Sequence, residues 1–111
     1  HFLGYRSDIP QLLQMSDLSV SASHREGLPV HLIEAMFAGL PIVTTKCRGA
    51  TELVEDGVNG FVVGFDEDEF IEGVQKTRNN KILKKSVRIY SIDNISVKIN
   101  KIYKETLCKK V

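Results

Sequence analysis

The sequence contains no tryptophan and only two cysteines. Cys47 and Cys108 lie far apart, without the CxxC or Cys/His spacing of a zinc site or a disulfide framework, so both are expected to be free thiols in a reducing cytosol. No apolar run approaches the roughly 20 residues of a membrane span, and no signal peptide is expected. A length of 111 residues allows one domain at most. These features favour a cytoplasmic globular domain.

Basic residues are scarce in residues 1–75, and acidic residues are scarce in residues 76–111. Residues 1–75 contain 4 Lys or Arg and 12 Asp or Glu, a net charge of −8, whereas residues 76–111 contain 11 and 2, a net charge of +9. The basic part suits peripheral contact with an anionic membrane, or it is a solvated, lysine-rich helix face, and both interpretations stay open. Nucleic-acid binding would rest on these lysines alone, so no nucleic-acid partner is expected.

Strand-like and helix-like segments alternate along the chain. Short apolar runs predict strands at residues 1–5, 17–23 and 40–45, and residues 50–63 are expected to hold a short element, a turn and a strand. Helical periodicity predicts helices at residues 7–16, 29–38, 66–80 and 91–107. Ser7 or Asp8 is expected to cap the first helix, whose first turn accommodates Pro10. Gly57 and the pair Asn59-Gly60 are expected to supply positive φ angles for a tight turn.

This alternation, with short connections, predicts an α/β fold. We expect a partial Rossmann-like parallel sheet of about four strands with helices on both faces. Four strands make about half of a doubly wound domain, and the chain opens on His1 inside an apolar segment, so residues 1–111 are interpreted as part of a longer domain. Residues 84–111 are expected to form a terminal amphipathic, basic helical region with isoleucines at 92, 95, 99 and 102 along one stripe.

The stretch "SHREGLPVHLIEAMFAGLPIV", residues 23–43, holds the candidate site. Ligands of doubly wound sheets bind beyond the carboxyl ends of the strands, and the loop "HREGLP" follows such an end. Gly27 would let a ligand approach the backbone closely, and Pro29 suits the start of a helix. The free N–H groups at that helix N-terminus would suit a phosphate or diphosphate.

Two carboxylates flank this anion site. Glu26 lies in the loop, and Glu34 is expected on the core stripe of the helix, defined by Val30, Ile33 and Phe37. A buried carboxylate needs hydrogen-bond partners, and the vicinal hydroxyls of a sugar or ribose would provide them. In the alternative, Glu26 is a solvated loop charge and Glu34 pairs with a lysine or a backbone N–H. The residues alone leave both interpretations open.

The string "EGLPVHLIEAMFAGLPIVTT", followed by "GATELVEDGVNGFVV", resembles the signature of the family 4 retaining glycosyltransferases of GT-B fold, also called glycosyl transferases group 1. The match runs from about Phe2 to Val63. The resemblance implies an enzyme that transfers a hexose, with retention, from a UDP-, GDP- or ADP-sugar to a polysaccharide or glycolipid acceptor. It implies no bound metal and no cofactor. It also implies that residues 1–111 are the C-terminal part of the nucleotide-sugar-binding domain, without the N-terminal acceptor domain.

The resemblance assigns roles by position. Glu26 matches a catalytic glutamate beside the donor sugar, and Glu34 matches the glutamate that binds the ribose hydroxyls. Residues 27–29, which are Gly27, Leu28 and Pro29, match a segment whose backbone contacts the sugar and diphosphate. Ser23 matches a serine at a strand end with either a structural or a ligand role. The family commonly has Gly-Gly where this chain has Arg48-Gly49-Ala50, and Arg48 could reach a diphosphate or remain a solvated loop residue.

Two other functions stay open. The isolated chain, lacking the partner domain, is expected to be inactive, and it could still act as a nucleotide-sugar or phosphate binding fragment. A GT-B epimerase acting on a UDP-sugar is the other alternative, with His24 as the histidine available in the loop. A nicotinamide dehydrogenase is disfavoured because no GxGxxG follows a strand, and no P-loop supports a kinase.

Overall fold

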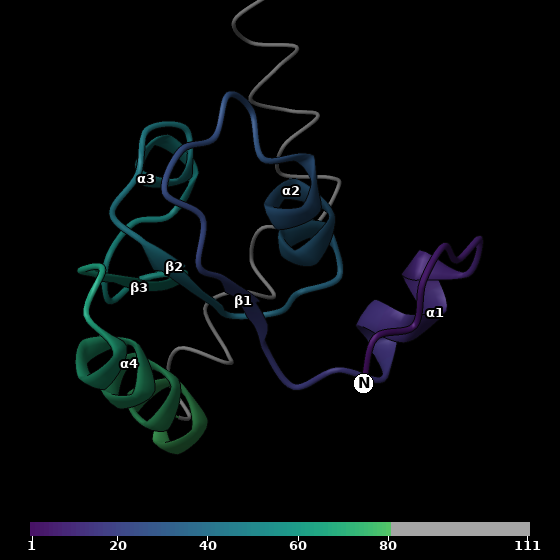
Figure 1. Cartoon of the computed structure of the whole chain (residues 1–111). Helices are drawn as coiled ribbons and strands as arrows, with labels where there is room; N and C mark the ends of the chain where they lie inside the picture. The colour runs from purple at the N-terminus through teal and green to yellow at the C-terminus, as the bar shows by residue number, and fades with distance from the viewer. Residues whose placement is uncertain (81–111) are drawn as a thin grey trace, which may run out of the picture.

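The computed structural model describes residues 1–80, so the predicted helix at 91–107, the 84–111 region and Cys108 lie outside the described residues. Three parallel strands form one sheet in the order β1-β2-β3 (Figure 1). Their bounds are Ser19–Ser21 for β1, Ile42–Thr45 for β2 and Gly60–Val63 for β3. The helices are α1 (Ile9–Gln14), α2 (Val30–Phe37), α3 (Ala50–Leu53) and α4 (Glu67–Asn79).

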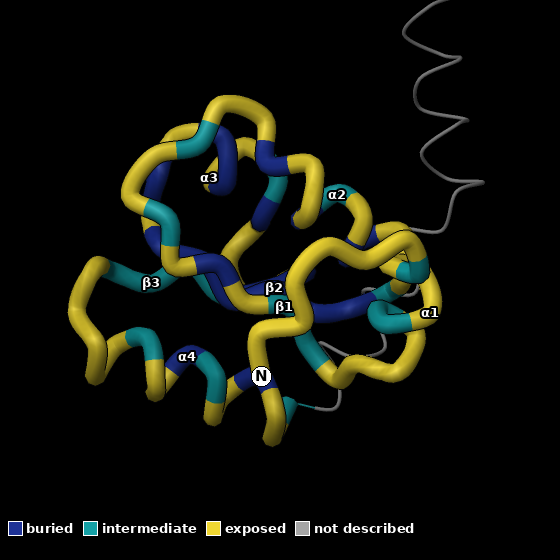
Figure 2. The backbone as a smooth tube through the Cα atoms, turned by 45° about the vertical axis from the view of Figure 1, so that its right-hand side comes forward, coloured by how far each residue is buried: buried dark blue, intermediate teal, exposed yellow. Residues whose placement is uncertain are grey.

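Helices cover both faces of the sheet, as the sequence predicts. The helices α2 and α3 lie on one side of the sheet, and α4 lies on the other (Figures 1 and 2). The expected number of about four strands is slightly too high, because residues 1–5 form no strand. Among residues 1–80 the strands β1, β2 and β3 pair only with one another, so residues 1–5 make no ladder hydrogen bonds with the sheet.

The central strand β2 is buried along its whole length, as its continuous apolar run predicts (Figure 2). Ile42 belongs to the core on the α2 and α3 side, with Leu32 and Ala35 of α2 and Ala50 of α3. Val43 faces α4 instead, since it lies close to Gly73 of that helix. Complete burial of an Ile or Val side chain stabilises a fold by about 1.5–3 kcal/mol. The strand therefore holds both helical layers together.

The edge strand β1 is less covered. Val20 pairs in register with Val43, so it faces the α4 side of the sheet. The helix α4 packs against β2 and β3, and Val20 remains 52% exposed. The alternation of apolar and serine residues in this segment therefore does not mark the buried face here, where Ser21 is the buried residue.

A glycine sets the distance between α4 and the sheet. A Cβ atom on Gly73 would lie 2.8 Å from Cγ1 of Val63, so a larger residue would push the helix outward. Thr77, one turn later, is buried as well, and its hydroxyl donates to the Gly73 carbonyl at 2.8 Å. The helix begins at a capping residue, Asp66, whose Oδ1 accepts from the N–H groups of Asp68 and Glu69 at 3.0 and 3.3 Å.

Asp8 is the N-cap residue of α1, as expected, but its side chain makes no capping hydrogen bond. The Asp8 carboxylate pairs with the Arg6 guanidinium instead, and this hydrogen bond lowers the pKa of the Asp8 carboxyl. Pro10 lies in the first turn, as expected. Leu13 then packs against the core and attaches α1 to the domain.

The turn before β3 uses its residues differently from the prediction. Gly57 has the expected positive φ of 76°, but neither Asn59 nor Gly60 has one. Asn59 is buried, and its side chain accepts from the Glu55 N–H at 2.8 Å and donates to the Leu53 carbonyl at 3.0 Å. Steric crowding requires glycine at position 60, because a Cβ on Gly60 would lie 2.2 Å from the Ile42 carbonyl oxygen.

Replacing Asn59 with alanine should lower the free energy of unfolding by about 1–3 kcal/mol, because a fully buried side chain and its two part-buried hydrogen bonds to the backbone would be lost. The measurement is urea unfolding followed by circular dichroism. Asn79→Ala is the matched control, since Asn79 is exposed, and its effect should stay within about 0.5 kcal/mol. Equal effects of the two substitutions would show that the Asn59 hydrogen bonds do not stabilise the turn.

Candidate functional site

The loop between β1 and α2, residues 22–29, is fixed to the end of β2. The Thr45 hydroxyl donates to the backbone carbonyl of Ser23. The Ser23 hydroxyl in turn donates to Oε1 of Glu26 at 2.6 Å. Ser23 and Glu26 are both half-buried. The carboxylate is therefore held at the carboxyl edge of the sheet by a chain of two side-chain hydrogen bonds that begins on the most buried strand.

A glycine brings the next loop against this one. Gly49 has a φ of 87°, and a Cβ there would lie 2.4 Å from the Gly27 carbonyl oxygen and 3.1 Å from that of Glu26. Only a residue without a side chain allows this approach, and the left-handed φ independently favours glycine. The loops that follow β1 and β2 are thus in direct backbone contact at the candidate site.

The N-terminus of α2 opens at the same edge. Pro29 is fully buried and is the N-cap residue, so the helix begins at Val30, one residue later than predicted. Its carbonyl accepts from the Leu32 and Ile33 N–H groups at 3.0 and 3.3 Å. The N–H groups of Val30 and His31, the first two of the helix, have no such carbonyl partner among the described residues, which leaves them available to an anion. Gly27 is exposed, and a Cβ on it would meet open space, so no steric contact in the described residues requires glycine at this position.

Glu34 corrects the sequence-based prediction of burial. It is exposed, and so are Val30 at 57% and Phe37 at 43%. The buried stripe of α2 consists of Leu32, Ala35 and Met36. The predicted stripe was wrong because an eight-residue helix with apolar residues on nearly every side fits more than one orientation. Glu34 therefore needs no internal partner, and its carboxylate lies one turn from Val30 on the open face of the helix.

The predicted site residues are partly brought together. Ser23, Glu26 and Gly27 lie in one loop, and the exposed Arg48 precedes the glycine that touches that loop. Leu28 is 66% exposed at the same loop. Cys47, beside Arg48, is buried as a free thiol and does not face the opening. Sequence reasoning missed Thr45 and Gly49, although a hydroxyl residue ending a buried apolar strand was a signal for the first.

Metal-ligating side chains do not gather in the described part of the chain. Among residues 1–80 no group of three or more His, Cys, Asp or Glu side chains is placed to hold a metal ion. Within the same residues, no helix has the length and apolar character needed to cross a membrane.

This architecture is the GT-B glycosyltransferase fold, in the form of a partial Rossmann-like parallel sheet with helices on both faces. The family model described as "Glycosyl transferases group 1" matches residues 1–103, and the chain belongs to this family. Both expectations from the sequence motif are confirmed.

Two bacterial relatives show the extent of the similarity. The Escherichia coli UDP-Gal:alpha-D-GlcNAc-diphosphoundecaprenol alpha-1,3-galactosyltransferase is 35% identical over 82 residues, which are 73% of this chain and 21% of that protein. The Campylobacter jejuni N,N'-diacetylbacillosaminyl-diphospho-undecaprenol alpha-1,3-N-acetylgalactosaminyltransferase is 43% identical over 61 residues, which are 55% of this chain and 16% of that protein. The aligned part of this chain therefore spans about a fifth or less of the length of these relatives.

Solved structures extend the comparison. HepE of Anabaena in complex with UDP superimposes with a TM-score of 0.71 at 32% identity, covering 96% of this chain and 31% of HepE. The same protein in complex with UDP-glucose gives a TM-score of 0.64 at 31% identity, with the same coverage.

Substituting Gly49 with alanine should distort the candidate site as well as the fold. The new Cβ would collide with the Glu26–Gly27 backbone, so we expect amide chemical shifts to move throughout residues 22–29, with a loss of about 2 kcal/mol or more in unfolding free energy. Two-dimensional NMR and urea unfolding measure the two effects.

Gly57→Ala is the matched control. Gly57 has a similar positive φ, but a Cβ on it would meet nothing within 4 Å. Its substitution should therefore cost about 1 kcal/mol without moving the shifts of residues 22–29. If the Gly49 substitution also left those shifts unchanged, the contact between the two loops would not fix the site.

Proposed function

We propose that this chain carries the nucleotide-sugar donor site of a retaining glycosyltransferase. One observation supports this most: the open N-terminus of α2 lies beside the fixed Glu26, at the carboxyl edge of the sheet. A diphosphate suits the helix N-terminus, and a carboxylate next to it suits the hydroxyls of a sugar. Proteins with UDP and UDP-glucose bound are among the structures that share this fold.

Each predicted residue has a place in this proposal. Glu26 faces the donor sugar as the catalytic group, and the Ser23 hydroxyl holds its carboxylate in position. The backbone of Gly27, Leu28 and Pro29 contacts the sugar and the diphosphate. Glu34, exposed on α2, accepts hydrogen bonds from the ribose hydroxyls.

Arg48 supplies positive charge to the diphosphate from the neighbouring loop. Together with the N–H groups of α2, this charge stabilises the departing nucleoside diphosphate without a metal ion or another cofactor. On this ground we propose that the reaction requires no metal ion.

We place the acceptor-binding site outside this chain, in a second domain of a longer protein. The relatives above are named for transfer to sugars on diphosphoundecaprenol, which supports a hexose transfer to a glycolipid or polysaccharide acceptor. Transfer needs a second domain that holds the acceptor and excludes water, so the isolated chain should bind donor without transferring it. Measurable transfer by the 111-residue chain would contradict this part of the proposal.

We place the reaction at the cytoplasmic side of a membrane, with the basic segment 76–111 toward anionic lipid. Cosedimentation with vesicles containing phosphatidylglycerol should then exceed cosedimentation with neutral vesicles and weaken at high salt. Equal binding to both vesicles would contradict the membrane contact and leave the donor site unaffected.

If Glu34 belongs to the donor site, its substitution should weaken nucleotide binding without lowering the stability of the fold. Glu34→Gln should weaken UDP binding about tenfold, because a charged acceptor for the ribose hydroxyls is lost. The unfolding free energy should change by less than about 0.5 kcal/mol, since Glu34 is exposed. NMR titration with UDP, GDP and ADP measures the affinities and identifies the base.

Glu52→Gln is the control for Glu34→Gln, because Glu52 is an exposed glutamate on α3. It should leave the affinity for each nucleotide unchanged. If no nucleotide moved the shifts of residues 22–34 of the folded chain, this chain would not contain a functioning donor site.

A further inference from the structure

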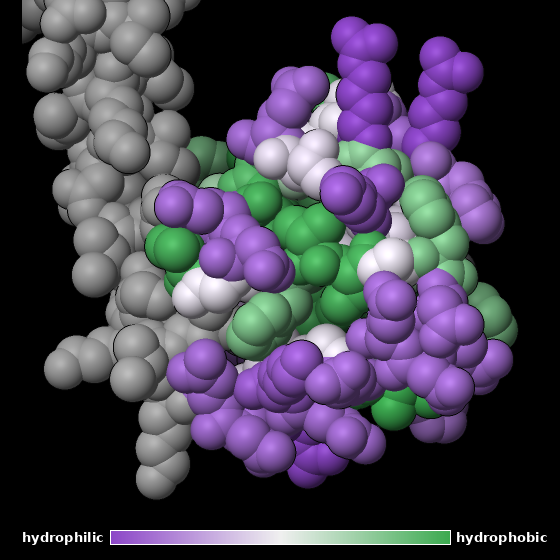
Figure 3. Space-filling view, turned by 90° about the vertical axis from the view of Figure 1, so that its left-hand side faces the viewer, coloured by the Kyte–Doolittle hydropathy of each residue, from purple (hydrophilic) through white to green (hydrophobic). Residues whose placement is uncertain are grey.

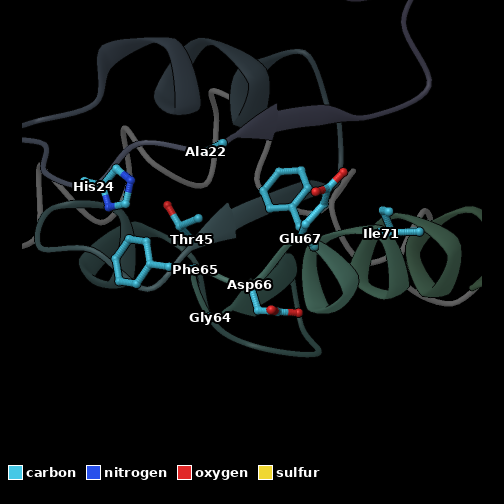
Figure 4. A pocket seen from close by; sticks show the side chains of 9 residues that line it. Ala22, His24, Thr45, Gly64, Phe65, Asp66, Glu67 and Ile71 are labelled. Carbon is cyan, nitrogen blue, oxygen red and sulfur yellow. The ribbon is translucent and has the colours of Figure 1, made fainter.

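A second hollow lies at the carboxyl edge of the sheet, on the α4 side. Its volume is about 440 Å³, within the range of small-molecule pockets. Its lining comes from the ends of all three strands and from the first turns of α4 (Figure 4). Thr45 and Phe70 lie on this side, whereas α2 and its N-terminus lie on the opposite side of the sheet. The hollow is thus distinct from the proposed donor site.

One wall is a pair of stacked rings. The His24 and Phe65 ring centroids are 4.8 Å apart and the ring planes differ by 6°. Figure 4 shows the two rings together at one side of the hollow, with Glu67 and Ile71 at the other. Phe65 is 54% exposed, so the stack is open to a ligand. An exposed aromatic stack provides a flat apolar surface.

The opposite wall carries carboxylates. Asp66 caps α4 through one oxygen, and the Glu67 side chain has no hydrogen bond or ion pair among residues 1–80. No Lys or Arg is among the described residues that line the hollow. Phosphate groups would therefore be repelled, whereas neutral hydroxyl groups could donate to the carboxylates.

The surface around the hollow also combines apolar and hydrophilic side chains. Figure 3 views the side of the molecule on which the β3–α4 loop lies in Figure 1. Apolar surface gathers in the middle of that face, and hydrophilic side chains surround it. A ligand with one apolar face and several hydroxyl groups at its edge fits this combination.

We propose that this hollow binds a neutral sugar ring. The C–H face of the ring packs against the His24–Phe65 stack, and its hydroxyls donate to Glu67 and to the free oxygen of Asp66. This saccharide site goes beyond the proposed donor site and does not require a bound nucleotide. His24 lies two residues before Glu26, so the saccharide site and the proposed donor site share the loop of residues 22–29.

The test is an NMR titration of the full chain with the methyl glycosides of glucose, galactose and N-acetylglucosamine, each to about 100 mM, where sites of millimolar affinity saturate. The site predicts saturating shifts at His24, Phe65 and the first turns of α4 with at least one glycoside. Uridine and inorganic phosphate, titrated separately, should not move those signals. Flat spectra with all three glycosides would overturn the proposal, as would saturation of the same signals by uridine or phosphate.

Two pairs of variants separate binding from folding. Phe65→Ala should abolish glycoside binding, whereas Phe2→Ala, at an exposed phenylalanine outside the hollow, should not. Glu67→Gln should weaken binding about fivefold, and Glu52→Gln should not change it. Wild-type affinity in both Phe65→Ala and Glu67→Gln would overturn the assignment of this hollow. Failure of UDP to bind would bear on the donor site alone, because the glycoside titration contains no nucleotide.

Discussion

The burial of β2 on both of its faces is the constraint on which the other elements depend. Ile42 packs under α2 and α3, and Val43 packs against α4, so the strand fixes the positions of both helical layers. Its last residue, Thr45, holds the loop after β1 through Ser23, and the loop after β2 returns Gly49 to the same backbone. The hydrophobic core thereby sets the geometry of the carboxyl edge, where the proposed donor site lies.

Much of this fold was predictable because its signals are local and strong. The apolar run of β2 and the periodicity of α2 and α4 each predict an element whose observed position agrees within a few residues. The strand expected at residues 1–5 was wrong, since strand formation depends on a neighbour to pair with and not on composition alone. Asn59 and Gly60 were assigned to a turn for the wrong reason, because hydrogen bonding and close packing are tertiary features that a turn motif does not reveal.

The candidate site, like the fold, was predictable from the sequence only in part. Its residues were identified from motif spacing, but the orientation of α2 was not, and Glu34 proved exposed where burial was expected. The exposure of Glu34 removes the argument that burial requires a ligand, and its proposed role now depends on its place one turn into α2, where its carboxylate can accept hydrogen bonds. The links through Thr45 and Gly49, and the stack of His24 on Phe65, join segments distant in the chain, so a local pattern does not reveal which residues they contact.

A crystal structure of this chain grown with UDP would test the donor site most directly. The proposed function predicts diphosphate oxygens within about 3 Å of the N–H groups in the first turn of α2, with the ribose hydroxyls on Glu34. It also predicts that Glu26 remains bound to Ser23 beside the terminal phosphate. A nucleotide bound away from α2, or one whose ribose points away from Glu34, would contradict the proposed donor site.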